Sequence, residues 1–327
     1  MPQFRKILVI MNPTAGQRSA SRLRSRIEAY FIEKGHDFAL RESEQKGDTL
    51  KWARTATAEG FDLVVAAGGD GTIREAAEGL MRSGARIPLA QVPAGTTNFS
   101  ARALGIPMNP RSALDLIDTG KVERFDIGYL PEHDQYFVFV AGTGYDATLI
   151  HDTPDNLKKR FGFLAYVGTG IREFFRLRPV QMEVEIDNQK RYFRAHTVMA
   201  INIGSISNLR FSFAPDIDPH DGRLNIAIMS SRSFWGSLIV LLKILAKRYY
   251  GYDDLKLTKA RRIRVAADPP LPFEIDGEPL GTTPFLAEII PDAISYLVPG
   301  DYAPEMLVER TEEAAFVPQP SLGATSG

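Results

Sequence analysis

The stretch LVVAAGGDGT, Leu63–Thr72, predicts a buried strand that ends at a glycine-rich turn. Its apolar part, Leu63–Ala67, has the length of a strand, and Ile73–Arg82 after the turn predicts a helix. Paired glycines let the backbone adopt positive φ and come close to a ligand. The free N–H groups at the start of the helix attract phosphate, and the Asp70 carboxylate can organise a cation on that phosphate. The stretch therefore predicts a phosphate site of the type found in kinases.

Two further loops argue against an ordinary turn, which Gly68–Thr72 alone leaves open because turns favour glycine and aspartate. A strand-like run, Ile87–Val92, leads into the polar loop Pro93–Asn98. Another, Ile7–Met11, ends in Asn12–Gly16. Ligands bind at the carboxyl ends of strands in open α/β sheets. Three such loops therefore favour one ligand site at this edge of a sheet.

Length, charge and composition restrict the class of protein. The chain has 327 residues, enough for two domains, and its 44% of apolar residues allow an ordinary globular core. A net charge of −1 gives no support for nucleic-acid binding, and the lack of cysteine excludes thiolate chemistry. The N-terminus lacks a signal-peptide pattern, and the apolar stretch Phe234–Ala246 is shorter than the ~20 residues of a membrane span. We therefore expect a cytoplasmic protein, with peripheral contact with a membrane surface left open.

Two regions with different patterns follow one another along the chain. Residues 1–126 alternate strands and helices, which predicts an α/β domain with a parallel sheet. Its other expected helices are Ser19–Lys34, Asp48–Glu59 and Arg111–Thr119. Residues 127–291 predict an antiparallel β-rich domain with strands at Tyr136–Ala141, Val180–Ile186, Tyr192–Asn202, Leu224–Met229 and Arg262–Ala266. Two helical insertions are expected at Asn156–Arg176 and Ser233–Tyr250. Residues 312–327 have a composition typical of a disordered tail.

Several motifs beyond the phosphate turn give the sequence a family resemblance. They are Asn12-Pro13 with Gly16; Glu75; Pro93–Thr96 with Asn98, Ala101 and Arg102; Gly142–Ala147; Ala214–Asp216; Asp221-Gly222 with Leu224; and Asp276–Glu278. With these motifs the chain resembles the bacterial diacylglycerol kinase-like lipid kinases, relatives of the diacylglycerol, sphingosine and ceramide kinases, over roughly residues 5–300. The Gly-Gly-Asp-Gly string alone also resembles NAD kinases and phosphofructokinases. The resemblance implies a nucleotide-binding first domain of that type, completed near the end of the chain by about residues 292–311.

The resemblance also implies a set of nucleotide-binding residues in the first domain. They are Asn12, Ser43, Gly68, Gly69, Asp70, Gly71, Thr72, Glu75 and Thr96. Backbone N–H groups of the turn would bind the phosphates of ATP, and Asp70 would arrange a catalytic Mg²⁺. Ser43 stands where the family usually has threonine, with a solvated loop serine as the alternative. Asp126 resembles another family carboxylate, with a capping role as its alternative, whereas Phe99 replaces a frequent family aspartate.

Asp276 is the candidate base of the second domain. The pair Asp276-Gly277 is also a strong hairpin signal, so the residues alone favour a turn role. The resemblance implies instead that Asp276 accepts the proton of the attacking hydroxyl. Glu278 would assist this transfer or bond only to the turn.

An acidic loop in the second domain is the candidate for a structural metal. Asp216, Asp218 and Asp221 repel one another unless water solvates them or a cation bridges them. The resemblance implies a structural Mg²⁺ held by Asp221 and by the carbonyl groups of Asp218 and Arg223. A loop that is only solvated is the alternative.

The sequence indicates the lipid-binding region less clearly than the nucleotide-binding region. The basic residues Lys158–Arg160 precede an aromatic segment, residues 161–175, a combination that suits an anionic membrane surface. Packing of these aromatic residues in a helical core is the alternative.

The residues and the resemblance together predict an ATP-dependent lipid kinase that phosphorylates a hydroxyl group of diacylglycerol or a related lipid. Its expected partners are ATP and the lipid, with no nucleic acid, and a homodimer is left open. Two alternatives remain. One is a soluble small-molecule kinase similar to NAD kinase. The other is a catalytically weak regulator that binds lipid or nucleotide, for which Phe99 is the only support.

Overall fold

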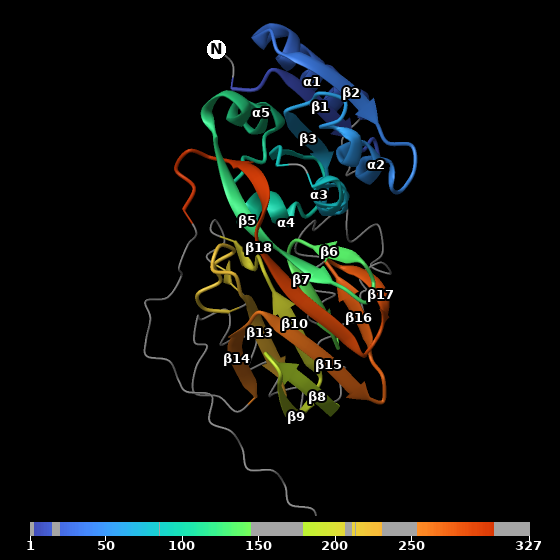
Figure 1. Cartoon of the computed structure of the whole chain (residues 1–327). Helices are drawn as coiled ribbons and strands as arrows, with labels where there is room; N and C mark the ends of the chain where they lie inside the picture. Colours follow the sequence, from blue (N-terminus) through green and yellow to red (C-terminus); the bar gives the residue numbers. More distant parts are fainter. Residues whose placement is uncertain are drawn as a thin grey trace, which may run out of the picture.

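The computed structural model describes residues 3–14, 20–84, 86–144, 179–206, 211–212, 214–230 and 254–303. Within these ranges the chain forms an α/β part and a β-rich part, stacked one above the other (Figure 1). The parallel strands of the first part and the antiparallel sheets of the second confirm the expected fold class. The two expected helical insertions, the aromatic segment and the tail at 312–327 lie outside the described residues.

The α/β part is built on parallel strands. In their order across the sheet they are β2 (Asp37–Glu42), β1 (Lys6–Met11), β3 (Leu63–Gly68) and β4 (Leu89–Pro93). Strand β3 is buried throughout, as expected for a central parallel strand covered on both faces. The sequence pattern does not predict β2, because this edge strand is mostly half-exposed and mixes apolar with charged residues.

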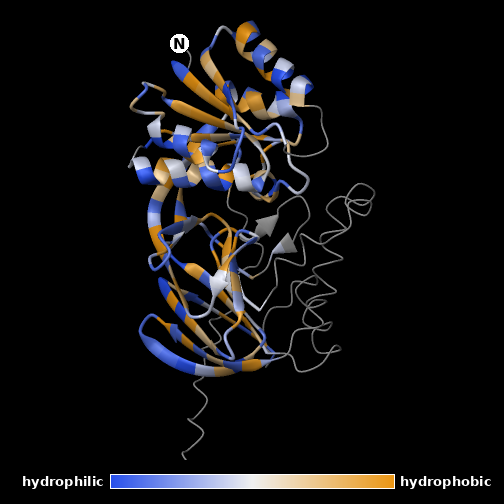
Figure 2. Ribbon diagram, turned by 90° about the vertical axis from the view of Figure 1, so that its right-hand side faces the viewer, coloured by the Kyte–Doolittle hydropathy of each residue, from blue (hydrophilic) through white to orange (hydrophobic). Residues whose placement is uncertain are grey.

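Helices connect and cover these strands. Within the described residues they are α1 (Ala20–Lys34), α2 (Asp48–Thr55), α3 (Asp70–Ser83), α4 (Phe99–Ala103) and α5 (Pro110–Thr119). Figure 2 shows hydrophobic central strands covered by helices that also carry hydrophilic residues. Helix α2 ends at Thr55, before the predicted Glu59, and turns follow as far as Gly60, whose φ is +82°. Positive φ favours glycine, so Gly60 ends this segment as expected.

The β-rich part contains the remaining strands. In chain order they are β5 (Lys121–Leu130), β6 (Gln135–Phe137), β7 (Val140–Thr143), β8 (Val180–Ile186), β9 (Gln189–Ala195), β10 (Thr197–Ile201), β11 (Ser205–Ile206), β12 (Phe211–Ser212), β13 (Leu224–Met229), β14 (Leu255–Ala260), β15 (Arg262–Asp268), β16 (Pro272–Ile275), β17 (Glu278–Thr282) and β18 (Phe285–Val298). One sheet has the order β14-β13-β10-β7-β16-β17, and a second extends the α/β sheet through β18, β15, β8 and β9. A hydrophobic core that includes Val198, Phe273 and Phe285 joins strands of both sheets.

Strands β5 and β18 run through both parts of the molecule (Figure 1). Strand β18 pairs with β15 at its start, with β5 along its length and with β4 where Tyr296 meets Leu89. The chain therefore returns to the α/β sheet late in the sequence. Strand β5 continues without a break through residues 126 and 127, where the sequence patterns change. The exact domain limits stay a prediction.

Two predicted strands are each broken in two. The run Tyr136–Ala141 forms β6 in one sheet and β7 in the other, and Tyr192–Asn202 is divided in the same way into β9 and β10. The first break has a clear cause: the N–H groups of Val138, Phe139 and Val140 all donate to the Asp276 carboxylate. Three consecutive N–H groups directed at one side chain cannot follow the alternation of a sheet ladder.

Candidate active site

The phosphate turn lies where β3 passes into α3. The helix begins at Asp70, earlier than the predicted Ile73, and the N–H groups of Thr72 and Ile73 donate to the Gly69 carbonyl at 3.0 and 3.2 Å. A Cβ atom on Gly68 would lie 2.3 Å from Thr72 Oγ1, and one on Gly95 would lie 2.6 Å from Gly69 Cα. Glycine at position 68 therefore leaves room for the Thr72 side chain, and glycine at position 95 allows the loop after β4 to come this close to the turn after β3.

Asn12 and Ser43 join this edge of the sheet from β1 and β2. The Asn12 side chain donates to Thr72 Oγ1 at 3.3 Å. The Ser43 N–H donates to the Met11 carbonyl at 2.9 Å, which places Ser43 beside the end of β1. Thr96 lies exposed on the loop after β4. The three predicted loops thus meet at the carboxyl edge of the parallel strands, but the contacts of Asn12, Ser43 and Thr96 with a nucleotide stay predictions.

The Asp70 carboxylate connects the phosphate turn to the next loop. It accepts hydrogen bonds from the N–H groups of Phe99 and Ser100 and from Ser100 Oγ, all at 2.9 Å. Asp70 therefore caps α4, a helix that begins far from it in the sequence. Ser100 is a site residue that the sequence reasoning missed, because it has no local motif. Glu75 has a similar structural contact, since it accepts from the Gly47 N–H at 3.2 and 3.3 Å.

Asp276 lies at the turn between β16 and β17 and is half-buried. Asp276 and Gly277 have φ of +50° and +83°, as the hairpin signal predicts. The Oδ1 atom accepts from the N–H groups of Phe139 and Val140 at 2.8 and 3.0 Å, and Oδ2 accepts from Val138 at 2.8 Å. Burial raises the pKa of Asp276 to about 6, although the three N–H groups act in the opposite direction. The turn role and a base role are thus compatible in one residue.

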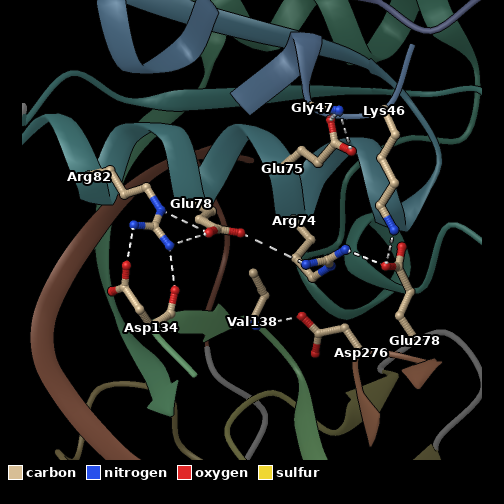
Figure 3. Close-up of polar contacts among 10 residues, drawn as sticks. All are labelled: Lys46, Gly47, Arg74, Glu75, Glu78, Arg82, Asp134, Val138, Asp276 and Glu278. Atoms are coloured by element: carbon tan, nitrogen blue, oxygen red, sulfur yellow. Dashed lines mark hydrogen bonds and ion pairs between the residues drawn. The ribbon is translucent and has the colours of Figure 1, made fainter. Parts of the chain in front are cut away.

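Glu278 brings the Asp276 hairpin against the phosphate turn (Figure 3). Its Oε2 atom pairs with Arg74 Nη2 at 2.7 Å and with Lys46 Nζ at 2.8 Å. Its Oε1 atom would lie 3.7 Å from a Cβ atom built on Gly71. Burial acts to raise the pKa of Glu278, but Lys46 and Arg74 together lower it. Arg74 and Lys46 are further site residues that the sequence reasoning missed.

Asp126 has a structural position. It is buried, and its carboxylate accepts from the N–H groups of Gly222 and Asp292 at 2.7 and 2.8 Å. Burial raises its pKa. These contacts favour the capping alternative, because Asp126 connects the acidic loop, through Gly222, to β18, through Asp292.

The acidic loop has a lysine ammonium group bound to the carboxylate that was expected to hold a structural metal. Asp221 Oδ2 binds Lys259 Nζ at 2.6 Å, and the same ammonium group donates to the Asp216 carbonyl at 2.7 Å. Asp221 Oδ1 accepts from the Arg223 N–H, and Asp218 Oδ1 accepts from the N–H of His220. No group of three or more potential metal-binding side chains occurs in the described parts of the chain. An ammonium group thus already binds one oxygen of the expected Mg²⁺ ligand Asp221, which favours the loop without a metal, and the metal site itself stays a prediction.

Known proteins match both parts of the chain. The family model described as the diacylglycerol kinase catalytic domain matches residues 6–130. The model described as the YegS C-terminal NAD kinase beta sandwich-like domain matches residues 139–298. A solved structure described as a putative diacylglycerol kinase from Bacillus anthracis str. Sterne is similar, with a TM-score of 0.76 and 25% identity, over 91% of this chain and 98% of that one.

Two relatives from bacteria match most of the chain. The diacylglycerol kinase of Bacillus subtilis is 31% identical over 287 residues, which are 86% of this chain and 92% of that protein. A probable YegS-like lipid kinase of Pseudomonas fluorescens is 31% identical over 302 residues, 91% of this chain and 96% of that protein. The chain therefore belongs to the family of bacterial lipid kinases that share the diacylglycerol kinase catalytic domain.

Proposed function

We propose that the protein is a lipid kinase that transfers the γ-phosphoryl group of ATP to a hydroxyl group of diacylglycerol or a related lipid. One observation carries this proposal. The half-buried carboxylate of Asp276 lies on a hairpin whose Glu278 pairs with Arg74 of α3, the helix that begins at the phosphate turn. A candidate base and a candidate phosphate site are thus adjacent, although 206 positions separate Asp70 from Asp276 in the numbering.

The residues have distinct roles in the proposed reaction. The N–H groups at the start of α3 bind the phosphates of ATP and place its γ-phosphorus. Asp276 accepts the hydroxyl proton while the lipid oxygen forms a bond to that phosphorus and the bond to the β–γ bridging oxygen breaks, which releases ADP. Oδ2 suits this step better than Oδ1, because it accepts one backbone N–H and Oδ1 accepts two. With a pKa of about 6, Asp276 is mostly ionised at neutral pH.

Mg²⁺ is the cofactor proposed for this site. The Asp70 carboxylate fits this role, because within the described ranges Oδ2 accepts only the Phe99 N–H, which leaves a lone pair for a water molecule bound to the metal. When bound, Mg²⁺ neutralises phosphate charge during transfer. The Asp70 carboxylate would then orient metal-bound water while its other contacts keep α4 in place.

The acceptor class rests on the family and stays a proposal for this chain. The named relatives include a diacylglycerol kinase and a probable lipid kinase. No helix in the described ranges is long and apolar enough to span a membrane. We propose a cytoplasmic enzyme that reaches its lipid by transient contact with a membrane surface. The Phe99 ring packs edge-on against the Phe139 ring, with 5.1 Å between the ring centroids, and the Phe139 N–H binds Asp276, so aromatic side chains lie next to the candidate base.

The test is phosphorylation by purified protein with labelled ATP and Mg²⁺. Diacylglycerol, monoacylglycerol and a sphingoid alcohol are offered in detergent micelles, and NAD and free sugars are offered in solution. The proposal expects labelled lipid and little or no labelled NAD or sugar. Efficient labelling of a water-soluble acceptor with no labelled lipid would favour the small-molecule kinase, and no labelling at all would favour the regulator.

A further inference from the structure

Helix α3 carries a stripe of charged residues on the side that faces the β-rich part. Arg74, Glu78 and Arg82 follow one another at intervals of four residues, so they share one face of the helix. Arg74 and Glu78 are only 5% and 3% exposed. Burial of charged groups is costly unless each is paired. The partners of these charged residues therefore show which ion pairs join α3 to the β-rich part.

The two arginines have different partners. Arg82 Nη1 pairs with Asp134 at 2.6 Å and Arg82 Nη2 with Glu78 at 2.8 Å, away from the Asp276 hairpin (Figure 3). Arg74 Nη2 pairs with Glu278 at 2.7 Å, and its Nη1 lies 3.9 Å from Glu78. Arg74 Nε is buried and has no hydrogen-bond partner among the described residues. Arg74 is therefore directed at the hairpin, and its strongest contact lies two residues from Asp276.

We propose that Arg74 is a positioning residue for phosphoryl transfer: by binding Glu278, it fixes the Asp276 hairpin against the phosphate helix and keeps a positive charge beside the Asp276 carboxylate. This inference rests on the proposed function, because it assigns Arg74 a role through Asp276. The Arg74 side chain extends from α3, whose first turn is the proposed phosphate site, to Glu278 on the hairpin that carries Asp276. Arg74 thus sets the distance between the proposed phosphate site and the proposed base, Asp276.

The charges around Asp276 give the expected direction of its titration. Arg74 from α3 and the N–H groups of residues 138–140 favour the ionised carboxylate. Buried Tyr296 of β18 also lies near Asp276: burial, and secondarily the Asp276 charge, raise the pKa of its hydroxyl. Glu278 adds a negative charge on the hairpin, which Arg74 and Lys46 offset, and Glu75 lies close enough to Glu278 to interact with it. Loss of the Arg74 charge would leave Glu278 less compensated and raise the pKa of Asp276.

The experiment compares Arg74→Met with Arg74→Lys and with Arg82→Met. Arg82→Met is the matched control, because it removes an arginine from the same stripe without touching the hairpin. The pH dependence of kcat/KM for a lipid acceptor is measured for each. Arg74→Met should move the acidic limb of the profile upward by roughly one pH unit and lower kcat more than it raises the KM for ATP. Arg74→Lys should restore much of the pH profile, and Arg82→Met should leave the limb in place.

A second measurement does not depend on activity. Aspartate labelled with carbon-13 at the side-chain carboxyl allows the titration of Asp276 to be followed by NMR, with Asp276→Asn used to assign its signal. The Asp276 pKa should rise in Arg74→Met and not in Arg82→Met. An unchanged Asp276 titration in folded Arg74→Met would overturn the inference. If the Asp276 pKa rises in Arg74→Met but the wild-type protein phosphorylates no lipid, the proposed function is overturned instead. The coupling of Arg74 to Asp276 then still holds.

Discussion

Two acidic turns of this protein have similar sequences and different surroundings. The hairpin at Asp276-Gly277 and the loop at Asp221-Gly222 both combine an aspartate with a glycine of positive φ, +83° and +67°. In each, a cation from another element binds a nearby carboxylate: Arg74 binds Glu278, and Lys259 binds Asp221. The family resemblance predicts a catalytic base, Asp276, in the hairpin and a metal ligand, Asp221, in the loop.

The difference lies in what remains unsatisfied. In the acidic loop the ammonium group of Lys259 donates hydrogen bonds to both Asp221 Oδ2 and the Asp216 carbonyl. A side chain of the protein therefore binds the two oxygens that a cation would otherwise bind. In the hairpin, Arg74 and Lys46 pair with Glu278. Among the described residues, Asp276 accepts hydrogen bonds only from backbone N–H groups and pairs with no cation. A half-buried carboxylate that no cation neutralises can accept a proton, whereas a carboxylate paired with lysine mainly stabilises a loop.

Substitution of the hairpin aspartate should have the largest effect. Asp276→Asn removes the proposed base, which typically costs about 10²- to 10⁴-fold in rate. Stability should change less, because two effects oppose each other. The variant loses an acceptor for backbone N–H groups, but it also removes a carboxylate whose pKa is about 6 in the folded protein against 3.8 unfolded. Ionisation of Asp276 therefore destabilises the fold as pH rises from about 4 to 6, by on the order of 3 kcal/mol.

The matched control is Asp126→Asn, which removes a buried carboxylate that, like Asp276, accepts hydrogen bonds from backbone N–H groups. Turnover on lipid at saturating ATP and thermal unfolding are measured for both variants. Asp276→Asn should lose turnover with a folded protein that still binds ATP, and Asp126→Asn should lose stability with turnover within a few-fold of wild type. Near-normal turnover in Asp276→Asn would leave only the turn role.

The phosphate turn provides the second test. Asp70→Ala should lower turnover by about 10²-fold, because it removes both the cap of α4 and the carboxylate proposed to orient water on Mg²⁺. Loss of the cap alone should cost about 1 kcal/mol of stability. Activity is measured as a function of Mg²⁺ concentration. If Asp70→Ala needs the same Mg²⁺ concentration as wild type and turns over normally, Asp70 acts only as a cap.

Sequence reasoning reached the parts of the site that are local in the chain. Strand β3, its turn and α3 are contiguous, so their apolar run and glycines predict them directly. The contacts that decide chemistry join distant segments: Val138 and Asp276 are 138 residues apart, and Lys46 and Glu278 are 232 apart. An Asp-Gly pair looks the same whether an arginine, a lysine or water faces it. The ammonium bridge of the acidic loop was missed for this reason, because nothing near Asp221 in the sequence indicates Lys259.

Removal of the lysine in the acidic loop should have a smaller effect, on stability rather than on rate. The Lys259 and Asp221 side chains are only 30% and 23% exposed. Lys259→Met should lower the free energy of unfolding by about 1–3 kcal/mol, because it leaves the Asp221 carboxylate and the Asp216 carbonyl without their donor. Lys256→Met, on the same strand, is the control. Denaturant unfolding measures both, and turnover should stay within a few-fold of wild type in each. A loss of turnover as large as that of Asp276→Asn would abolish the distinction between the two turns.

The smallest expected effect is that of metal on wild-type stability, and it separates the ammonium bridge from a metal site most directly. Because Lys259 already supplies the positive charge of the loop, EDTA and millimolar Mg²⁺ should leave the thermal midpoint of the wild-type protein without nucleotide nearly unchanged. In Lys259→Met the same carboxylate and carbonyl are freed, so Mg²⁺ should raise the midpoint, because a ligand that binds only the folded state stabilises it. Ca²⁺, which accepts the same oxygen donors with looser geometry, should do the same. If EDTA instead destabilises the wild-type protein and Mg²⁺ restores it, the loop binds a metal alongside Lys259, and the two acidic turns are more alike than their hydrogen bonds indicate.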